Sequence, residues 1–289
     1  MLKRLIGVAA VAAIMVTAPA SAQQAIRLAV TDVEGMESLQ RDFGPFKDVL
    51  ERATGLKVDF FAVPGRTAAV EAMVAKQLDL VLTGPAEYVV FRARTNAQPL
   101  VALTRPDYFS QIVVLAEGPI KTAADLKGKK VSFGEIGSTS QHLGPAQVLA
   151  DVGLTYGRDY DPIFIKRNVA VEALKRGDIA AVGMNLSHLQ VIRRANPGVA
   201  LRVIARGRDL PDDLILASAD LSPDIVQKAR DAFLQKSDDL MKAVVSQKGD
   251  NEKYIGGGFL PRISDRDYDL VRAMYRAVGI NEFTKFIGN

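Results

Sequence analysis

Residues 134–145 read Gly134-Glu-Ile-Gly-Ser-Thr-Ser-Gln-His-Leu-Gly-Pro145, between the apolar run Lys130-Val-Ser-Phe133 and a helix-like segment at 146–152. We interpret this order as a strand, a glycine-bracketed turn rich in hydroxyl groups, and a helix. The hydroxyl residues 138–140 would then lie where a helix leaves its first backbone N–H groups unpaired. Such a turn can surround a small tetrahedral anion without a metal ion or a lysine. It also fits an ordinary helix N-cap, so the turn alone leaves both interpretations open.

The first 22 residues have the pattern of a secretory signal peptide. Lys3 and Arg4 form a short basic region, residues 5–16 an apolar segment, and Ala20-Ser21-Ala22 a small-residue cleavage site. The apolar segment is short for a bilayer-spanning helix, and polar Gln23-Gln24 follows it. We therefore expect Sec-dependent export, cleavage after Ala22, and a mature periplasmic protein without stable membrane insertion.

The composition excludes several classes of function. The full sequence has 37 basic and 33 acidic residues, and two of the basic ones lie in the signal peptide. The mature chain is thus nearly neutral, without the basic surface that nucleic-acid binding needs. There is no cysteine, which excludes disulfides, and only two histidines, so we expect no metal site and no cofactor.

Strand-like and helix-like segments alternate along the mature chain. Strands are expected at 25–30, 57–62, 78–83, 111–116, 130–133, 161–166, 179–183 and 201–205, and helices at 43–54, 67–76, 86–95, 146–152 and 169–176. From residue 222 onward helices dominate, with the longest at 224–246 and a closing helix at 265–278. This alternation favours a mainly parallel sheet covered by helices on both faces.

Two segments of the chain resemble each other. Arg66-Thr-Ala-Ala-Val-Glu-Ala-Met73 and Arg167-Asn-Val-Ala-Val-Glu-Ala-Leu174 are each followed by a turn, an aspartate and an apolar strand. This internal similarity favours two related lobes, although a helix followed by a strand is a common unit. Each arginine stands where a helix begins, a place that favours negative charge. The pair could bind an anion between the lobes, or both could be solvated surface residues.

Several motifs together resemble a known family. They are the Ser-Thr-Ser turn with Leu143 and Pro145 after it, the segment Asp125-Leu-Lys-Gly-Lys-Lys-Val-Ser-Phe133 before it, Gly84-Pro-Ala-Glu-Tyr88, and Leu210-Pro-Asp-Asp213. With the signal peptide, they resemble the phosphonate/phosphite-type periplasmic binding proteins of ABC transporters, over essentially the whole mature chain. The resemblance implies an α/β fold of the two-lobed type II kind, with a ligand held in the cleft between lobes that close around it.

The resemblance also implies a set of binding residues. Ser138, Thr139 and Ser140, with nearby amides, would hold the phosphonate or phosphite oxygens, and Tyr88 would line the opposite wall. Asp213 matches an acid that aminoalkylphosphonate binders use near the amine. From the residues alone, Tyr88 equally fits a buried tyrosine and Asp213 the start of a strand.

The sequence departs from the family pattern at four positions. Arg66 and Arg167 stand where relatives often have tyrosine and histidine, and Gln141 stands where glycine usually follows the turn. In an approximate alignment, Ser187 replaces a glutamate that helps to hold an amine. These changes add positive charge and remove an acid, so we expect Arg66, Arg167 and Gln141 to bind a small, fully anionic oxyanion without an amine.

His142 lies close to the serines, which raises the alternative of a Ser–His nucleophilic pair. Residues two apart near a helix start do not face one another, and no third orienting group is evident. We therefore expect no enzymatic activity, and a rim or capping role for His142.

The sequence thus predicts a monomeric periplasmic binding protein for a phosphorus oxyanion, delivering it to an inner-membrane ABC permease. The alternative is a receptor of the same kind that feeds a membrane sensor kinase. Lobe I is expected at 23–109 and 206–289, and lobe II at 110–205. Two hinge crossings are expected near 107–110 and 206–210.

Overall fold

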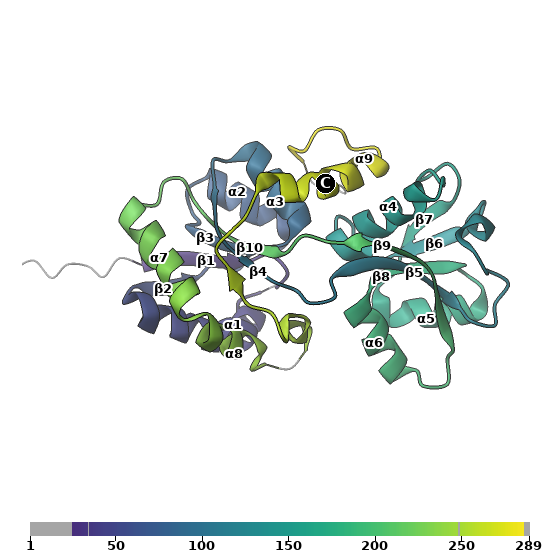
Figure 1. Ribbon diagram of the computed structural model, residues 1–289, viewed down its shortest axis with the longest axis horizontal. Coiled ribbons are helices and arrows are strands. Elements are labelled where there is room, and N and C mark those ends of the chain that lie inside the picture. Colours follow the sequence, from purple (N-terminus) through teal and green to yellow (C-terminus); the bar gives the residue numbers. More distant parts are fainter. Residues whose placement is uncertain (1–24, 34, 248, 286–289) are drawn as a thin grey trace, which may run out of the picture.

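A computed structural model describes residues 25–33, 35–247 and 249–285, except for the side chains of Arg167 and Asn168. The proposed signal peptide lies outside the described residues. Two lobes stand side by side, each built on its own sheet (Figure 1). We define lobe I by the six-stranded sheet and lobe II by the five-stranded sheet.

The sheet of lobe I has the strand order β11-β4-β10-β3-β1-β2. Its strands are β1 (Ala25–Val30), β2 (Lys57–Phe60), β3 (Leu80–Thr83), β4 (Gln98–Leu103), β10 (Asp213–Ala217) and β11 (Phe259–Leu260). The first three pair in parallel, and β10, inserted between β3 and β4, runs antiparallel to both. Asp79 accepts hydrogen bonds from the backbone and side chain of Arg27, which links the starts of β1 and β3.

The sheet of lobe II has the strand order β7-β6-β8-β5-β9. Its strands are β5 (Phe109–Leu115), β6 (Lys130–Phe133), β7 (Asp161–Phe164), β8 (Ala181–Asn185) and β9 (Leu201–Asp209). β6 is parallel to β7 and β8, whereas β5 is antiparallel to β8 and β9. Both sheets are therefore mixed, because β5 and β10, which enter from the other lobe, run against their neighbours.

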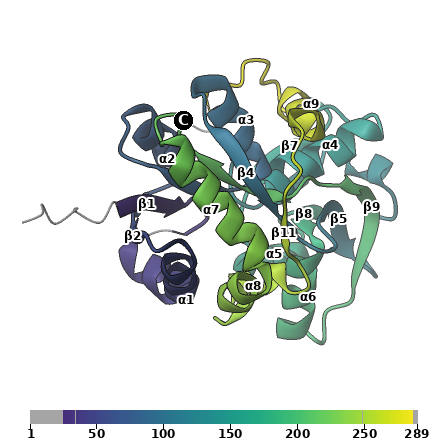
Figure 2. The same cartoon turned by 60° about the vertical axis from the view of Figure 1, so that its left-hand side comes forward.

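Helices cover both faces of each sheet, as the alternating pattern predicted. In lobe I, α1 (Met36–Thr54), α7 (Pro223–Gln235) and α8 (Ser237–Val245) pack on one face, and α2 (Arg66–Val74), α3 (Pro85–Arg94) and α9 (Asp269–Ala277) on the other (Figure 2). In lobe II, α4 (Gly144–Asp151) packs opposite α5 (Arg167–Arg176) and α6 (Leu186–Ala195). The apolar strands thus lie between two helix layers, which explains their nearly continuous hydrophobic runs.

The chain crosses between the lobes at residues 104–108 and 210–212. The expected boundary at 205 falls inside β9, which stays paired with β5 up to Asp209. The expected helix at 224–246 is two helices, α7 and α8, which meet at Lys236. At the closing helix, a 3₁₀ turn (Asp265–Tyr268) precedes α9.

Helix α9 belongs to the chain of lobe I and also contacts lobe II. It packs against α3 and against α4 (Figure 1). Leu143, just before α4, is buried in the same cluster as Val271 and Met274 of α9. The two lobes therefore share apolar contacts on this side of the molecule.

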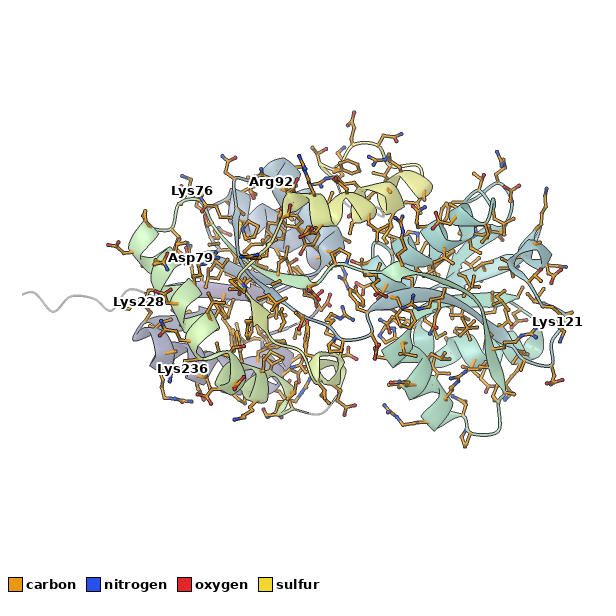
Figure 3. All side chains as sticks on the ribbon, in the orientation of Figure 1. Lys76, Asp79, Arg92, Lys121, Lys228 and Lys236 are labelled. Carbon is orange, nitrogen blue, oxygen red and sulfur yellow. The ribbon has the colours of Figure 1, made fainter. Side chains whose placement is uncertain are left out.

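The outer surface carries scattered charges of both signs. Lys228 of α7 and Lys236 are exposed at the far end of lobe I from lobe II, and Lys121 lies at the opposite end of the molecule (Figure 3). Within the part of the chain that is described, no helix combines the length and apolarity needed to cross a bilayer.

Candidate functional site: an inter-lobe anion cleft

A cavity of about 360 Å³ lies between the lobes. It is lined at the carboxyl ends of the parallel strands by residues such as Asp32 after β1, Gly84 after β3, Glu135 after β6 and Asn185 at the end of β8. Helices begin at this edge, so their positive dipole ends face the cleft. Ligands in open α/β sheets bind at such edges.

The hydroxyl-rich turn forms one wall of this cavity. Ser138 has extended backbone, and a single π-helical turn (Thr139–Leu143) follows it and continues into α4. Ser138, Thr139, Ser140 and Gln141 all line the cavity. The first amides of this helical segment have no carbonyl one turn earlier to bind, so they are available to an anion. Ser138 stands at the N-cap position of this helical segment but makes no side-chain capping hydrogen bond, so the helix start is open to the cleft.

The hydroxyl groups of the turn differ in their partners. Thr139 Oγ1 accepts a hydrogen bond of 3.0 Å from the backbone N–H of Ala86 in α3, across the lobe boundary. Ser140 Oγ accepts one of 2.9 Å from the side-chain amide of Asn185. Ser138 is buried and lines the cavity. Thr139 and Ser140 therefore also organise the site, whereas Ser138 is the simplest probe of direct binding.

His142 lies under the turn, inside lobe II. Its Nδ1 accepts a hydrogen bond from the backbone N–H of Gly137, and its Nε2 lies 3.0 Å from the hydroxyl of Tyr156. Burial lowers the pKa of His142 to about 4. The imidazole is thus neutral and accepts a backbone N–H of the turn from within the lobe, which fits the expected capping role and not the expected rim position.

Arg66 lines the cavity, but carboxylates surround its guanidinium. It pairs with Asp32 at 2.7 Å, with Glu87, and in a bidentate manner with Glu135 at 3.0 and 3.1 Å. Burial alone would lower the pKa of Arg66, but these carboxylates raise it above its ordinary value. Because Glu135 belongs to lobe II, Arg66 joins the lobes. Because these carboxylates already neutralise its charge, Arg66 is a poor candidate for the residue that supplies most of the positive charge to a bound anion.

A second buried arginine, Arg105, lies in the first crossing. Its guanidinium stacks on the ring of Tyr108, 3.7 Å from the centroid, and Nη1 lies 3.5 Å from Asp213 Oδ2. Burial would lower the pKa of Arg105, but Tyr108 and Asp213 raise it. Tyr254 donates a 2.6 Å hydrogen bond to the same oxygen of Asp213. Arg105, Tyr108 and Asp213 all line the cavity beside the turn.

The structure corrects the expected position of Tyr88. Its ring is buried in the core of lobe I, 4.4 Å from that of Tyr268, and its hydroxyl donates to Asp265 at 2.8 Å. It is not among the described residues that line the cavity. Tyr88 is in α3, and its side chain contacts the 3₁₀ turn that precedes α9. The buried-tyrosine interpretation of this residue is therefore the one that the geometry supports.

The remaining expected residues fall into two groups. Asp213 begins β10 and also lines the cavity, so both interpretations of it are compatible with the structure. Arg167 begins α5, as Arg66 begins α2, but its side chain lies outside the described part of the structure.

A family model described as "ABC transporter, phosphonate, periplasmic substrate-binding protein" matches residues 28–254. The chain belongs to this family. Like the solved structures that it resembles, this binding protein has the two-lobed α/β fold of type II periplasmic binding proteins.

Two curated relatives are also similar to the binding protein. A phosphate-import protein PhnD from Mycolicibacterium smegmatis is 28% identical over 282 residues, covering 89% of this chain and 86% of that protein. The phosphonates-binding periplasmic protein of Escherichia coli is 25% identical over 225 residues, covering 73% of this chain and 66% of that protein. Both are named as import or binding proteins rather than as enzymes.

Solved structures share the fold at low sequence identity. A binding component of an ABC phosphonate transporter from Pseudomonas aeruginosa gives a TM-score of 0.67 at 18% identity, covering 87% of this chain and 85% of that one. PhnD1 from Prochlorococcus marinus, in complex with methylphosphonate, gives 0.65 at 19% identity, covering 88% and 98%.

Sequence reasoning missed most of the charged residues of the cleft in this binding protein. The cavity is lined by four cations and five carboxylates among the described residues: Arg66, Arg105, Arg194, Lys253, Asp32, Glu135, Asp213, Asp250 and Glu252. Lys253 pairs with Asp32 at 3.2 Å, and although desolvation opposes it, the neighbouring cations hold the pKa of Asp32 well below its usual range. The only available signal was the position of Arg105 in Thr104-Arg-Pro-Asp-Tyr108, next to an expected crossing.

Proposed function

We propose that this protein captures a small phosphorus oxyanion, a phosphonate, phosphite or phosphate, between its lobes. The observation that carries the proposal is the turn at Ser138, Thr139 and Ser140, which brings hydroxyl groups and helix-start amides to the cavity. Charge-assisted hydrogen bonds contribute roughly 1.5–3 kcal/mol each, and four or five of them suffice for micromolar binding after the cost of closure. The relatives named for phosphate and phosphonates support this class of ligand.

We further propose that the protein acts in the periplasm as a monomer and hands its ligand to an inner-membrane ABC permease, without enzymatic activity. The family to which it belongs, that of ABC-transporter substrate-binding proteins, supports a role in import. The predicted signal peptide supports export. A sensor-kinase receptor would use the same cleft, so the two roles differ only in the partner.

Binding is tested by titrating protein that has been unfolded and refolded to remove any ligand. We expect phosphate, phosphite or methylphosphonate to stabilise it, by about 2.7 kcal/mol at a hundredfold excess over Kd, and nitrate to leave it unchanged. Ser138→Ala removes one donor and should raise Kd about tenfold. Ser132→Ala, in β6 and outside the cavity lining, is the matched control. If no phosphorus oxyanion binds, the proposed function is wrong.

Import is tested in a strain of the source organism that lacks the gene. Growth on the ligand as the sole phosphorus source should be lost and then restored by the wild type but not by Ser138→Ala. A receptor for a sensor kinase would instead change gene expression while uptake of the ligand continued.

A further inference from the structure

Arg105 and Asp213 meet where the chain crosses between the lobes. Arg105 lies in the first crossing, at 104–108, and Asp213 directly follows the second, at 210–212. The guanidinium is only 8% exposed and Asp213 is 2% exposed, so both groups have left bulk water. A buried charge is costly unless it has partners, which makes the partners of this pair informative.

Arg105 has donors that face the cavity. Its stacking on Tyr108 fixes the plane of the guanidinium, and the 3.5 Å approach to Asp213 is longer than a good hydrogen bond. Among the described residues, that carboxylate is its one ion-pair partner. Tyr108 itself lies against Ser140 of the turn. An anion on the turn would therefore reach a guanidinium that still has N–H groups to donate.

Asp213, in contrast, has an acceptor oxygen that lacks a hydrogen-bond donor. Its Oδ2 accepts from Tyr254 and faces Arg105, but its Oδ1 has no partner among the described residues. This oxygen lies beside Gly84, where a Cβ would come within 3.7 Å of it, and Gly84 also lines the cavity. A bound ligand that places one hydrogen-bond donor here would satisfy a buried acceptor that is otherwise left unpaired.

The charge of that donor follows from Arg105. Arg105 already supplies a positive charge to Asp213, so an ammonium group at the same carboxylate would meet a buried guanidinium of like charge. A neutral hydroxyl meets no such repulsion. The group that donates to Asp213 Oδ1 is thus an O–H group, carried by a ligand whose other oxygens are negatively charged.

We propose that the Arg105–Asp213 pair selects oxyanions that carry a P–OH group and excludes ligands that carry an ammonium group. This rests on the proposed function, because it assumes that a phosphorus oxyanion occupies the turn. Arg105 and the turn bind the anionic oxygens, and Asp213 Oδ1 accepts the hydrogen bond of the remaining P–OH. Sulfate and sulfonates, which hold no proton at neutral pH, are rejected by the same carboxylate.

The first experiment uses the wild-type protein and the titration of its ligands. The phosphate dianion keeps one P–OH group, whereas the methylphosphonate dianion has none. Between pH 6 and pH 9, we expect Kd for methylphosphonate to rise about tenfold per pH unit above its second pKa, because only the protonated fraction binds. Kd for phosphate should change less than about threefold over the same range, because its dianion still carries the P–OH group; titrating protein groups affect both ligands alike.

Titratable groups of the protein that lie near Asp213 also change the binding of both ligands with pH. They are Arg105, Tyr108, Asp212, Tyr254, Tyr268 and, beside Gly84, Glu87, with Asp32 next to Arg105. Taking the ratio of the two dissociation constants at each pH cancels their contribution. A ratio that stays constant from pH 6 to pH 9 overturns the proposal, as does sulfate binding as tightly as phosphate.

The second experiment changes the arginine. Arg105→Gln should weaken methylphosphonate binding about tenfold and shift the preference toward 2-aminoethylphosphonate by at least about tenfold. Arg105→Lys keeps the charge and should keep the discrimination. Arg176→Gln, at an exposed ion pair with Asp178, makes the same substitution outside the cleft.

The outcomes separate the two proposals. If the wild type binds phosphorus oxyanions but prefers 2-aminoethylphosphonate, or if Arg105→Gln leaves the preference unchanged, this inference fails and the proposed function stands. If no phosphorus oxyanion binds, both fail. Should Arg105→Gln not fold, the pH series on the wild type decides the inference.

Discussion

At the scale of single residues, the guanidinium of Arg66 is held by carboxylates from three segments. Asp32 follows β1, Glu87 lies in α3, and Glu135 follows β6. Glu87 is fully buried, and burial raises its pKa against the attraction of Arg66. Arg66 therefore neutralises the buried Glu87 and two more exposed carboxylates, so we expect it to contribute to stability.

We expect Arg66→Met to lower the free energy of unfolding by about 3 kcal/mol, because it leaves Glu87 buried without its cation. Urea denaturation measures the change. Adding Glu87→Gln to this variant should recover part of the loss. Lys76→Met, which removes an exposed pair with Asp220, is the control and should have little effect. Equal stability of Arg66→Met and the wild type would place Arg66 on the solvated surface.

His142 predicts a pH dependence of stability. Its pKa is about 4 in the folded protein and about 6.5 when unfolded, so the unfolded chain binds the proton first as the pH falls. Its contribution is complete above pH 6.5 and is lost toward pH 4. At pH 5 we expect a loss of about 2 kcal/mol relative to pH 8.

The measurement is urea denaturation of the wild type and His142→Gln at several pH values. Carboxylates titrate in both proteins, so the difference between them isolates the imidazole. If the two curves run parallel between pH 8 and pH 5, His142 is not held neutral by burial.

At the scale of elements, the π-helical turn and α4 depend on a close approach at Gly144. A Cβ there would lie 2.1 Å from Ser110 Oγ and 2.8 Å from the backbone oxygen of Thr139. The backbone contact cannot be relieved by rotating a side chain. The glycine that ends the turn is thus required by packing against β5 and against the turn itself.

Gly144→Ala should therefore displace the turn, lower the free energy of unfolding by about 1–3 kcal/mol, and weaken phosphate binding. Gly44→Ala is the matched control, since its Cβ would meet nothing within 4 Å inside α1. That substitution should stabilise the protein by about 0.5–1 kcal/mol. Urea denaturation and phosphate titration of both variants test these two predictions. Unaltered phosphate binding by Gly144→Ala would contradict the requirement for glycine at this position.

At the scale of the whole molecule, three kinds of contact join the lobes. Among the described residues they include the Arg66–Glu135 ion pair, the hydrogen bond from Ala86 to Thr139, and the apolar packing of α9 against α4 and Leu143. The first two lie at the cleft, so they can form only when the lobes are close together. They are well placed to slow the release of a ligand.

We expect Glu135→Gln to raise the dissociation rate of the ligand about two- to fivefold, with little change in the association rate. The effect is modest because the side chain of Glu135 is 55% exposed. Stopped-flow measurements with phosphate distinguish the two rates, and Glu117→Gln, in the loop after β5, serves as the control. An unchanged dissociation rate would show that this ion pair does not stabilise the closed form.

Local patterns were sufficient for most of the elements and for the turn. Alternation predicted β1 and β6 to the residue, because each is an apolar run bounded by polar residues. It did not identify β10 as a central antiparallel strand, since residues 213–217 carry no sign of the strands beside them. Arg66 was correctly placed at a helix start, but its carboxylate partners are distant in sequence.

The sequence by itself determined the α/β fold class, the position of the hydroxyl-rich turn at a helix start, and the family to which the chain belongs. These depend on periodicity and on short motifs, which are local properties of the chain. Only the tertiary structure decided which charges meet in the cleft. In the folded chain, carboxylates surround Arg66, Tyr88 is buried in the core, and Arg105 lies beside Asp213. Whether a cation is available to a ligand depends on long-range neighbours and burial, and no local pattern encodes these.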